Sequence, residues 1–93
     1  MKNKYILSEN VFVRLDLGKA FIYDGDNKQI YKIPLIYGMI MNEIRVEAKT
    51  FDEIHIKILS QVLGDKDFEQ YVKKIQSCIL KLIKYGFVVV VEG

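Results

Sequence analysis

Three kinds of side chain in this sequence could carry out chemistry: one histidine, His55, one cysteine, Cys78, and two closely spaced carboxylates, Asp24 and Asp26. A cysteine nucleophile needs a neighbouring base and a lowered pKa, and a metal site needs several ligands at suitable spacing. No second histidine and no cysteine lies at metal-ligand spacing from His55. We therefore expect His55 to be packed and hydrogen-bonded, Cys78 to be a small buried apolar residue, and the aspartates to form a turn.

The sequence also lacks the patterns of other catalytic classes. A Ser-His-Asp arrangement cannot be argued from a single histidine, and no Gly-rich phosphate-binding loop is present. We therefore predict that the protein is not an enzyme and that it holds no cofactor and no metal.

The composition indicates a single globular domain over residues 1–93. Hydrophobic residues make up 51% of the chain and charged residues 28%, and the net charge of +2 does not by itself call for a nucleic acid or an anionic membrane. No apolar run approaches the ~20 residues needed to cross a bilayer, and the apolar stretch Tyr5–Leu7 is too short for a secretory signal. We expect a cytoplasmic protein without an internal disulfide or a membrane partner.

The elements that would position these residues begin with three strand-like runs, Val11–Leu15, Lys19–Asp24 and Lys28–Ile33. The last two flank Gly25-Asp26-Asn27, whose residues tolerate a positive φ, so we expect an antiparallel hairpin. Pro34 cannot donate to a strand ladder, but its fixed φ suits the first position of a helix. With so few strands, at least one sheet edge is expected to stay unpaired, and another chain could add a strand there.

A helical pattern follows the hairpin. The run Pro34–Ile44 is apolar on nearly every side, which is typical of a helix buried between other elements. Gly38 within it weakens helix propensity, so we expect it to permit a close approach of neighbouring backbone. The residues Val46–Lys49 are predicted to form a loop, and Thr50–Glu53 reads as a capping box that opens a second helix, from Phe51 to about Leu63.

The last part of the chain predicts a third helix and a strand. Gly64 ends the second helix, and Asp65 or Asp67 caps the third, Phe68–Tyr85. Gly86 then stops the third helix, and Phe87–Val91 forms a final strand. The order is strand, strand, strand, helix, helix, helix, strand. It predicts an α+β fold: a winged helix-turn-helix with an N-terminal three-stranded antiparallel sheet.

Five segments combine hydrophobic and turn residues at a characteristic spacing: Leu7–Val11, Ala20–Asp24, Ile30–Pro34, Thr50–Ile54 and Leu82–Phe87. In these segments the sequence resembles the PqqD-like peptide-binding domains, also called RiPP recognition elements. The resemblance extends from Leu7 to about Val88. These domains serve the biosynthesis of ribosomally made, modified peptides, either as separate proteins or fused to enzymes.

This resemblance implies a peptide-binding function. In the family, the leader of a precursor peptide adds as a strand to the edge of the third strand and lies in a groove beside the third helix. The implied peptide-binding residues are Lys28, Gln29, Ile30, Tyr31, Lys32, Ile33, Tyr71, Lys74, Ile75, Cys78 and Leu82. The implied partners are the precursor leader peptide and a peptide-modifying enzyme, such as a radical SAM enzyme, a leader peptidase or a cyclase.

The third helix itself allows two interpretations. A core stripe is formed by Phe68, Val72, Ile75, Ile79 and Ile83, and it is widened by Tyr71, Cys78, Leu82 and Tyr85. The pattern alone favours packing of this whole face on the small sheet. The resemblance instead assigns Tyr71, Lys74 and Cys78 to the groove. The lysines that would suit a leader with acidic residues are Lys28, Lys32, Lys74 and Lys81.

DNA binding is the main alternative, because the helical half of the sequence looks like a winged helix. A recognition helix meets base edges with its N-terminal part, supported by Arg and Lys on phosphates. Here that part, Asp65–Glu69, is acidic, and both arginines, Arg14 and Arg45, lie outside the helix. We therefore place nucleic acid behind peptide binding. Self-association into a homodimer through exposed edges, including Phe87–Val91, is a third alternative.

Overall fold

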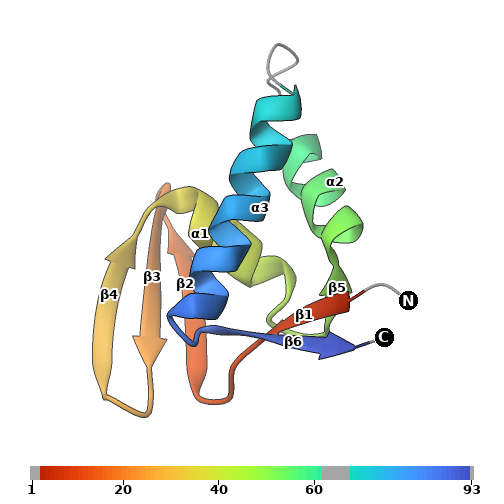
Figure 1. Cartoon of the computed structure of the whole chain (residues 1–93). Helices are drawn as coiled ribbons and strands as arrows, with labels where there is room; N and C mark the ends of the chain where they lie inside the picture. Colours follow the sequence, from red (N-terminus) through yellow and green to blue (C-terminus); the bar gives the residue numbers. More distant parts are fainter. Residues whose placement is uncertain (1–2, 62–67, 93) are drawn as a thin grey trace.

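The computed structural model describes residues 3–61 and 68–92, which form an α+β fold with two small sheets and three helices (Figure 1). The first sheet has the order β2-β3-β4, with β2 at Val11–Asp16, β3 at Lys19–Asp24 and β4 at Gln29–Ile33. The second has the order β5-β1-β6, with β1 at Asn3–Leu7, β5 at Lys49–Thr50 and β6 at Val88–Glu92. The helices are α1 at Leu35–Glu43, α2 at Phe51–Gln61 and α3 at Phe68–Lys84. The predicted three-stranded antiparallel sheet, three helices and C-terminal strand are confirmed.

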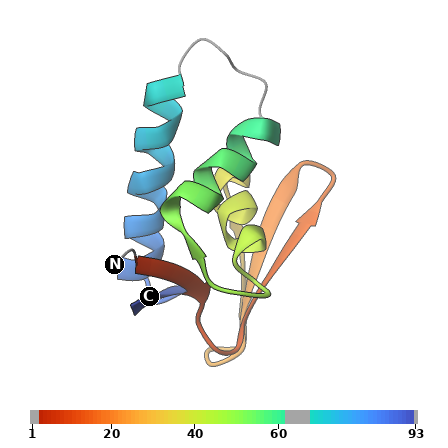
Figure 2. The same cartoon turned by 90° about the vertical axis from the view of Figure 1, so that its right-hand side faces the viewer.

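Helix α1 lies at the centre of the molecule. It contacts β2 and β3 as well as α2 and α3, and Figure 2 shows it between the β2-β3-β4 sheet and α3. The largest fully buried side chains come from β3 and from all three helices: Ile22, Ile40, Met41, Ile44, Ile54, Ile58 and Ile75. A single core therefore joins the sheet to the helices.

Gly38 lets α1 lie close to the sheet. It is buried, and a Cβ built on it would overlap the Cβ of Ala20 on β3 and lie 2.8 Å from Leu15 Cδ2. The close approach predicted at this glycine is confirmed. The helix is nevertheless less enclosed than its apolar sequence predicted, because Leu35 in its first turn remains 41% exposed.

The capping box at the start of α2 is present as predicted. The backbone N–H of Glu53 donates to Thr50 Oγ1 at 3.2 Å, and the backbone N–H of Thr50 donates to Glu53 Oε1 at 2.9 Å. These bonds satisfy two donors that the first turn of a helix leaves open. The predicted stop at Gly64 and the predicted cap at Asp65 or Asp67 lie outside the described residues, as does the predicted end of the second helix.

Two strands were not predicted from the sequence. β1 precedes the first predicted strand, and β5 includes Lys49 from the predicted loop. Their pairings join segments that are far apart in the chain: Tyr5 faces Val90, and Lys4 faces Thr50. Such short strands show no clear alternation of apolar and polar residues, so only their distant partners define them.

Three elements begin one residue later than predicted. β4 begins at Gln29, because Lys28 has a φ of 54° and belongs to the turn. Pro34 is the N-cap residue of α1, so the helix begins at the residue after it. The final strand begins at Val88 instead of Phe87.

Candidate functional site

A groove lies between β4 and the C-terminal end of α3. Its volume is about 540 Å³, and it is lined by Ile22, Asp24, Asn27, Tyr31, Lys32, Ile33, Pro34, Tyr37, Leu82, Tyr85 and Phe87. These residues come from β3, the hairpin turn, β4, the start of α1 with the preceding Pro34, and the end of α3 with the residues that follow it. The lining is mainly apolar and aromatic, with a carboxylate and a lysine among its polar groups. An open, largely apolar groove with a few polar groups is a typical binding site.

The end of α3 is shaped by Gly86. This glycine has a φ of 83°, its N–H donates to Ile83 O at 3.0 Å, and the N–H of Phe87 donates to Leu82 O at 3.0 Å. This is the pattern of a Schellman motif, in which the residue after the glycine packs on the last turn of the helix. The motif therefore places Phe87 next to Leu82, and both side chains line the groove.

Ser8 holds this helix end against the connection between β1 and β2. Its hydroxyl donates to Gly86 O at 2.6 Å, and its backbone N–H donates to Phe87 O at 2.9 Å. The residues that follow α3 are thereby fixed by two hydrogen bonds from a segment that leads into β2. These bonds tie the segment that carries Phe87, on one wall of the groove, to the connection before β2.

The opposite wall is β4, whose outer edge is open. β4 is the terminal strand of its sheet, and within residues 3–61 and 68–92 no strand pairs with its outer side. Tyr31 faces Ile22 of β3 and Ile33 faces Ala20, so their side chains lie on the core-facing side of the sheet, toward the groove. Lys32 also contributes to the lining. The unpaired backbone N–H and C=O groups of β4 can accept a further strand.

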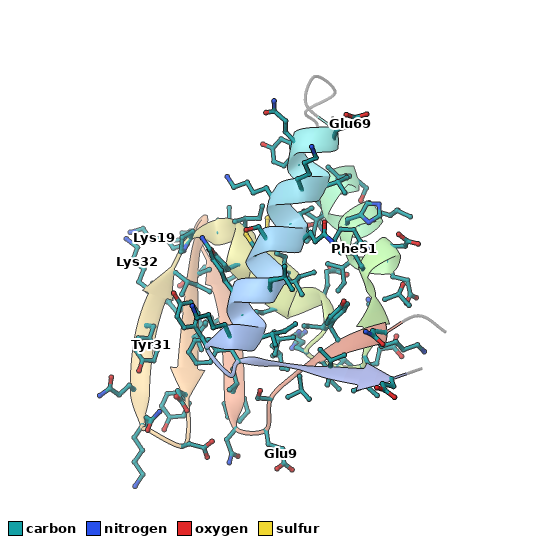
Figure 3. The ribbon with its side chains drawn as sticks, in the orientation of Figure 1. Glu9, Lys19, Tyr31, Lys32, Phe51 and Glu69 are labelled. Atoms are coloured by element: carbon teal, nitrogen blue, oxygen red, sulfur yellow. The ribbon has the colours of Figure 1, made fainter. Side chains whose placement is uncertain are left out.

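Three aromatic rings cluster across the groove. The Tyr31 and Phe87 rings have centroids 6.1 Å apart at 51°, and the Tyr85 and Phe87 rings have centroids 6.4 Å apart at 45°. Both geometries are favourable tilted contacts. Tyr31 is 38% exposed and Tyr85 is 67% exposed, so ring surface is available to a ligand. Figure 3 shows Tyr31 on β4, at the outer edge of the sheet.

The Tyr37 hydroxyl and the Cys78 thiol affect each other's pKa. Burial raises the pKa of the Cys78 thiol, and the neighbouring Tyr37, Lys74 and Lys81 offset this only in part. Burial and the contact with Cys78 also raise the pKa of Tyr37. The thiol is therefore neutral near pH 7, and the prediction that Cys78 is a buried apolar residue is confirmed by its 4% exposure.

At the hairpin end of the groove, Asp24 organises the turn. Its Oδ1 accepts from the backbone N–H of Asp26 at 3.1 Å and of Asn27 at 3.4 Å, and its Oδ2 accepts from Asn27 Nδ2 at 2.8 Å. Asp24 is only 8% exposed. The predicted role of Asp24 and Asp26 as turn residues is confirmed, and this turn fixes where β4 begins.

The structure brings together only part of the predicted binding set. Tyr31, Lys32, Ile33 and Leu82 line the groove with residues that the sequence analysis did not assign to it. Gln29 and Ile30 lie on β4 outside the groove lining, and the side chain of Ile30, which is 71% exposed, lies on the opposite face of the sheet. Lys28 lies in the turn.

The predicted residues from the first three turns of α3 lie elsewhere. Ile75 is fully buried, and Cys78 is 4% exposed, so both belong to the core. Tyr71 is half-buried and Lys74 is exposed, but neither lines the groove. In Figure 3, Glu69 marks the N-terminal end of α3, far above the level of Tyr31. Only the last turn of α3 meets β4 across the groove.

Three aromatic residues of the groove were missing from the predicted set: Tyr37, Tyr85 and Phe87. Tyr85 and Phe87 flank Gly86, and this glycine is a sequence signal for a turn that folds Phe87 back onto the helix. Tyr37 carries no comparable signal, because its position follows from how α1 crosses the sheet.

His55 lies on α2, away from the groove. Its Nδ1 is 3.1 Å from Phe51 O and 3.8 Å from Asp52 Oδ1, and its ring centroid is 4.8 Å from that of Phe51. The prediction of a packed, hydrogen-bonded histidine is confirmed. Within the described ranges, no group of three or more His, Cys, Asp or Glu side chains is placed to hold a metal ion. In the same ranges, no helix is both long and apolar enough to cross a membrane.

A second hollow, of about 470 Å³, lies on the other face of the β2-β3-β4 sheet. Its apolar lining is contributed by exposed side chains such as Phe12, Tyr23 and Ile30, which are 59, 41 and 71% exposed. The Phe12 and Tyr23 rings have centroids 6.1 Å apart. The sheet therefore has an apolar surface on both faces, but only the core-facing side forms a groove with α3.

Comparison with protein-family models, with curated proteins and with solved structures found no significant match.

Proposed function

We propose that this protein is a peptide-binding module that captures the leader of a ribosomally made precursor peptide by strand addition to β4. The observation that carries the proposal is the open edge of β4 beside an aromatic groove of about 540 Å³. In strand addition, main-chain hydrogen bonds provide affinity that tolerates sequence changes, and side-chain pockets provide selectivity. The groove supplies both kinds of contact at one place.

The geometry of the groove indicates which side chains of a leader it would recognise. A strand added to β4 alternates its side chains between the two faces of the sheet. Every second side chain would then enter the groove, where Tyr31, Leu82 and Phe87 offer apolar contacts. A leader with apolar residues at alternate positions is therefore favoured. Lys32, two residues after Ile30, lies on the other face of the sheet by strand alternation and would favour an acidic residue at a leader position that does not enter the groove.

The proposed mechanism is recruitment without catalysis. The protein would hold the leader while also contacting a peptide-modifying enzyme, such as a radical SAM enzyme, a leader peptidase or a cyclase. Tethering raises the effective concentration of the peptide core at the active site to the order of mM. The protein would need neither a cofactor nor a metal for this role, and we infer that it acts in the cytoplasm, where precursor peptides are made.

We also infer that α2, α3 and the sheet β5-β1-β6 correspond to a winged helix-turn-helix. Because winged helix-turn-helix domains often bind DNA, DNA binding is the alternative function. Recognition helices present basic and polar side chains at their N-terminal part. In the described part of α3, the first turn carries the acidic Glu69, and the basic residues Lys81 and Lys84 lie in the last turn. This charge distribution favours the peptide-binding proposal.

The proposal is tested by calorimetric titration with synthetic leader peptides from precursors encoded near this protein. A leader that binds is then resynthesised with N-methyl groups on alternate backbone amides. N-methylation removes hydrogen-bond donors but keeps every side chain, so one of the two alternating sets should abolish binding and the other should have little effect. Equal effects of both sets would contradict strand addition, and a scrambled leader provides the control for composition.

A further inference from the structure

The outer edge of β6 is another open strand edge. β6 is the terminal strand of the sheet β5-β1-β6, and in the part of the chain that the structure describes no strand pairs with its outer side. In Figure 1, β4 lies at the left of the molecule and β6 runs along the bottom, from beneath the end of α3 toward the right. Val89, Val90 and Val91 are 47, 38 and 40% exposed. Unpaired backbone groups and exposed apolar side chains therefore coincide along this strand.

This edge lacks the features that usually keep open strands apart. Natural edge strands are protected by lysine, proline, a bulge or a covering segment. The strand Val88–Glu92 has neither lysine nor proline, and it pairs regularly with β1 from Val88 opposite Leu7 to Glu92 opposite Asn3. The β4 edge differs, because it carries Lys32 and is followed directly by Pro34. Compared with the β4 edge, the β6 edge is the less protected against pairing.

A second copy of β6 fits this edge, because the strand is self-complementary under a two-fold axis. In an antiparallel pairing centred on Val90, Val90 faces its own copy, and Val89 faces the Val91 of the other copy. Directly opposed side chains contact each other across a strand pair, and β-branched pairs are favourable there. Glu92 falls opposite Val88, so the pairing opposes no two like charges. A two-fold arrangement of this kind is the commonest symmetry of homo-oligomers.

We propose that two copies of this protein associate through β6 and form one continuous antiparallel sheet with the strand order β5-β1-β6-β6-β1-β5. This inference stands on β6 alone and does not depend on the proposed peptide-binding function.

The test is the oligomeric state of the full chain, measured by sedimentation velocity over a concentration series. The wild-type protein is expected to sediment as a dimer that dissociates on dilution. Two double variants, Val89→Lys with Val91→Lys and Val89→Glu with Val91→Glu, are each expected to be monomeric, because they place like charges opposite one another. An equimolar mixture of the two variants is expected to form a heterodimer, since lysine then faces glutamate.

Val46→Lys is the matched control, because Val46 is 79% exposed in a loop outside both sheets. This variant should dimerise as the wild type does. A wild-type chain that is monomeric at every concentration would overturn the proposal, and so would lysine variants that stay dimeric. Amide spectra of the unsubstituted protein give a check that needs no variant: dilution should shift the amides of Val89–Val91, and shifts confined to β4 would contradict pairing through β6.

Discussion

At the scale of single residues, Gly38 shows how one missing side chain sets the position of a whole helix. Substitution by alanine would improve helix propensity by ~1 kcal/mol, but the added methyl group would overlap the Cβ of Ala20. We expect Gly38→Ala to lower the free energy of unfolding by about 2 kcal/mol, measured by urea denaturation.

The same prediction has an internal control. In an Ala20→Gly background the opposing methyl group is absent, so Gly38→Ala should be much less destabilising. An equal effect of Gly38→Ala in both backgrounds would show that contact with Ala20 does not explain the glycine.

Glu53 gives a residue-scale prediction with a defined pH dependence. The hydrogen bonds from Thr50, first that of its backbone N–H, lower the pKa of this carboxyl below its ordinary value of 4.5. The charged carboxylate therefore stabilises the fold above that value, and the contribution is lost as the pH falls through the lowered pKa. Glu53→Gln should be less stable than the wild type at neutral pH. In thermal melts, the melting temperatures of the two proteins should converge as the pH falls from about 5 to 3. A constant difference in melting temperature between variant and wild type across this pH range would contradict a stabilising role of the Glu53 charge.

At the scale of elements, β4 is the strand on which the peptide-binding proposal depends. Tyr31→Pro removes a backbone donor from this strand, whereas Tyr31→Ala removes only the ring. If a leader adds to the outer edge, the proline should weaken leader binding more than the alanine, by about tenfold or more, because ordered backbone pairing is lost. The readout is calorimetric titration of both variants, each checked for folding by circular dichroism. Equal affinities of two folded variants would contradict strand addition.

Lys32 tests the contribution of charge on β4. Lys32→Glu reverses one charge on the strand that would receive the leader, on the face that Ile30 shares, so binding of an acidic leader should weaken, and its dependence on salt should flatten. Lys57, which is exposed on α2 outside the groove, provides the matched control as Lys57→Glu. Equal losses for both variants would show that net charge matters and that the position of Lys32 does not.

The elements also show what could be predicted from the sequence. The β3–β4 hairpin, the capping box at Thr50 and the stop at Gly86 were all predicted, because each depends on residues that are neighbours in the chain. β1 and β5 were missed, because their strands exist only through pairing with distant segments. Dependence on distant contacts also explains why the predicted set of binding residues was incomplete. Helical periodicity placed Tyr71, Lys74 and Leu82 on related faces, but it does not say which turn of the helix reaches β4.

At the scale of the whole molecule, β4 and β6 are terminal strands of different sheets, and their edges differ in character. The β4 edge lies beside an aromatic groove whose far wall is fixed by Ser8, and the β6 edge carries exposed valines without a groove. The first edge suits an extended peptide that also has side chains to bury. The second suits a copy of itself. One small core, centred on α1, supports both edges and leaves both unpaired.

An amide NMR titration of isotope-labelled protein with candidate leader peptides tests strand addition to β4 most directly. We expect shifts confined to residues 29–33 of β4 and to the end of α3 around Leu82, Tyr85 and Phe87, with little change at Tyr71 and Lys74. Amides of the β4 edge should also become protected from hydrogen exchange when the leader binds. If a leader bound while the β4 amides stayed unshifted, strand addition at this groove would be contradicted.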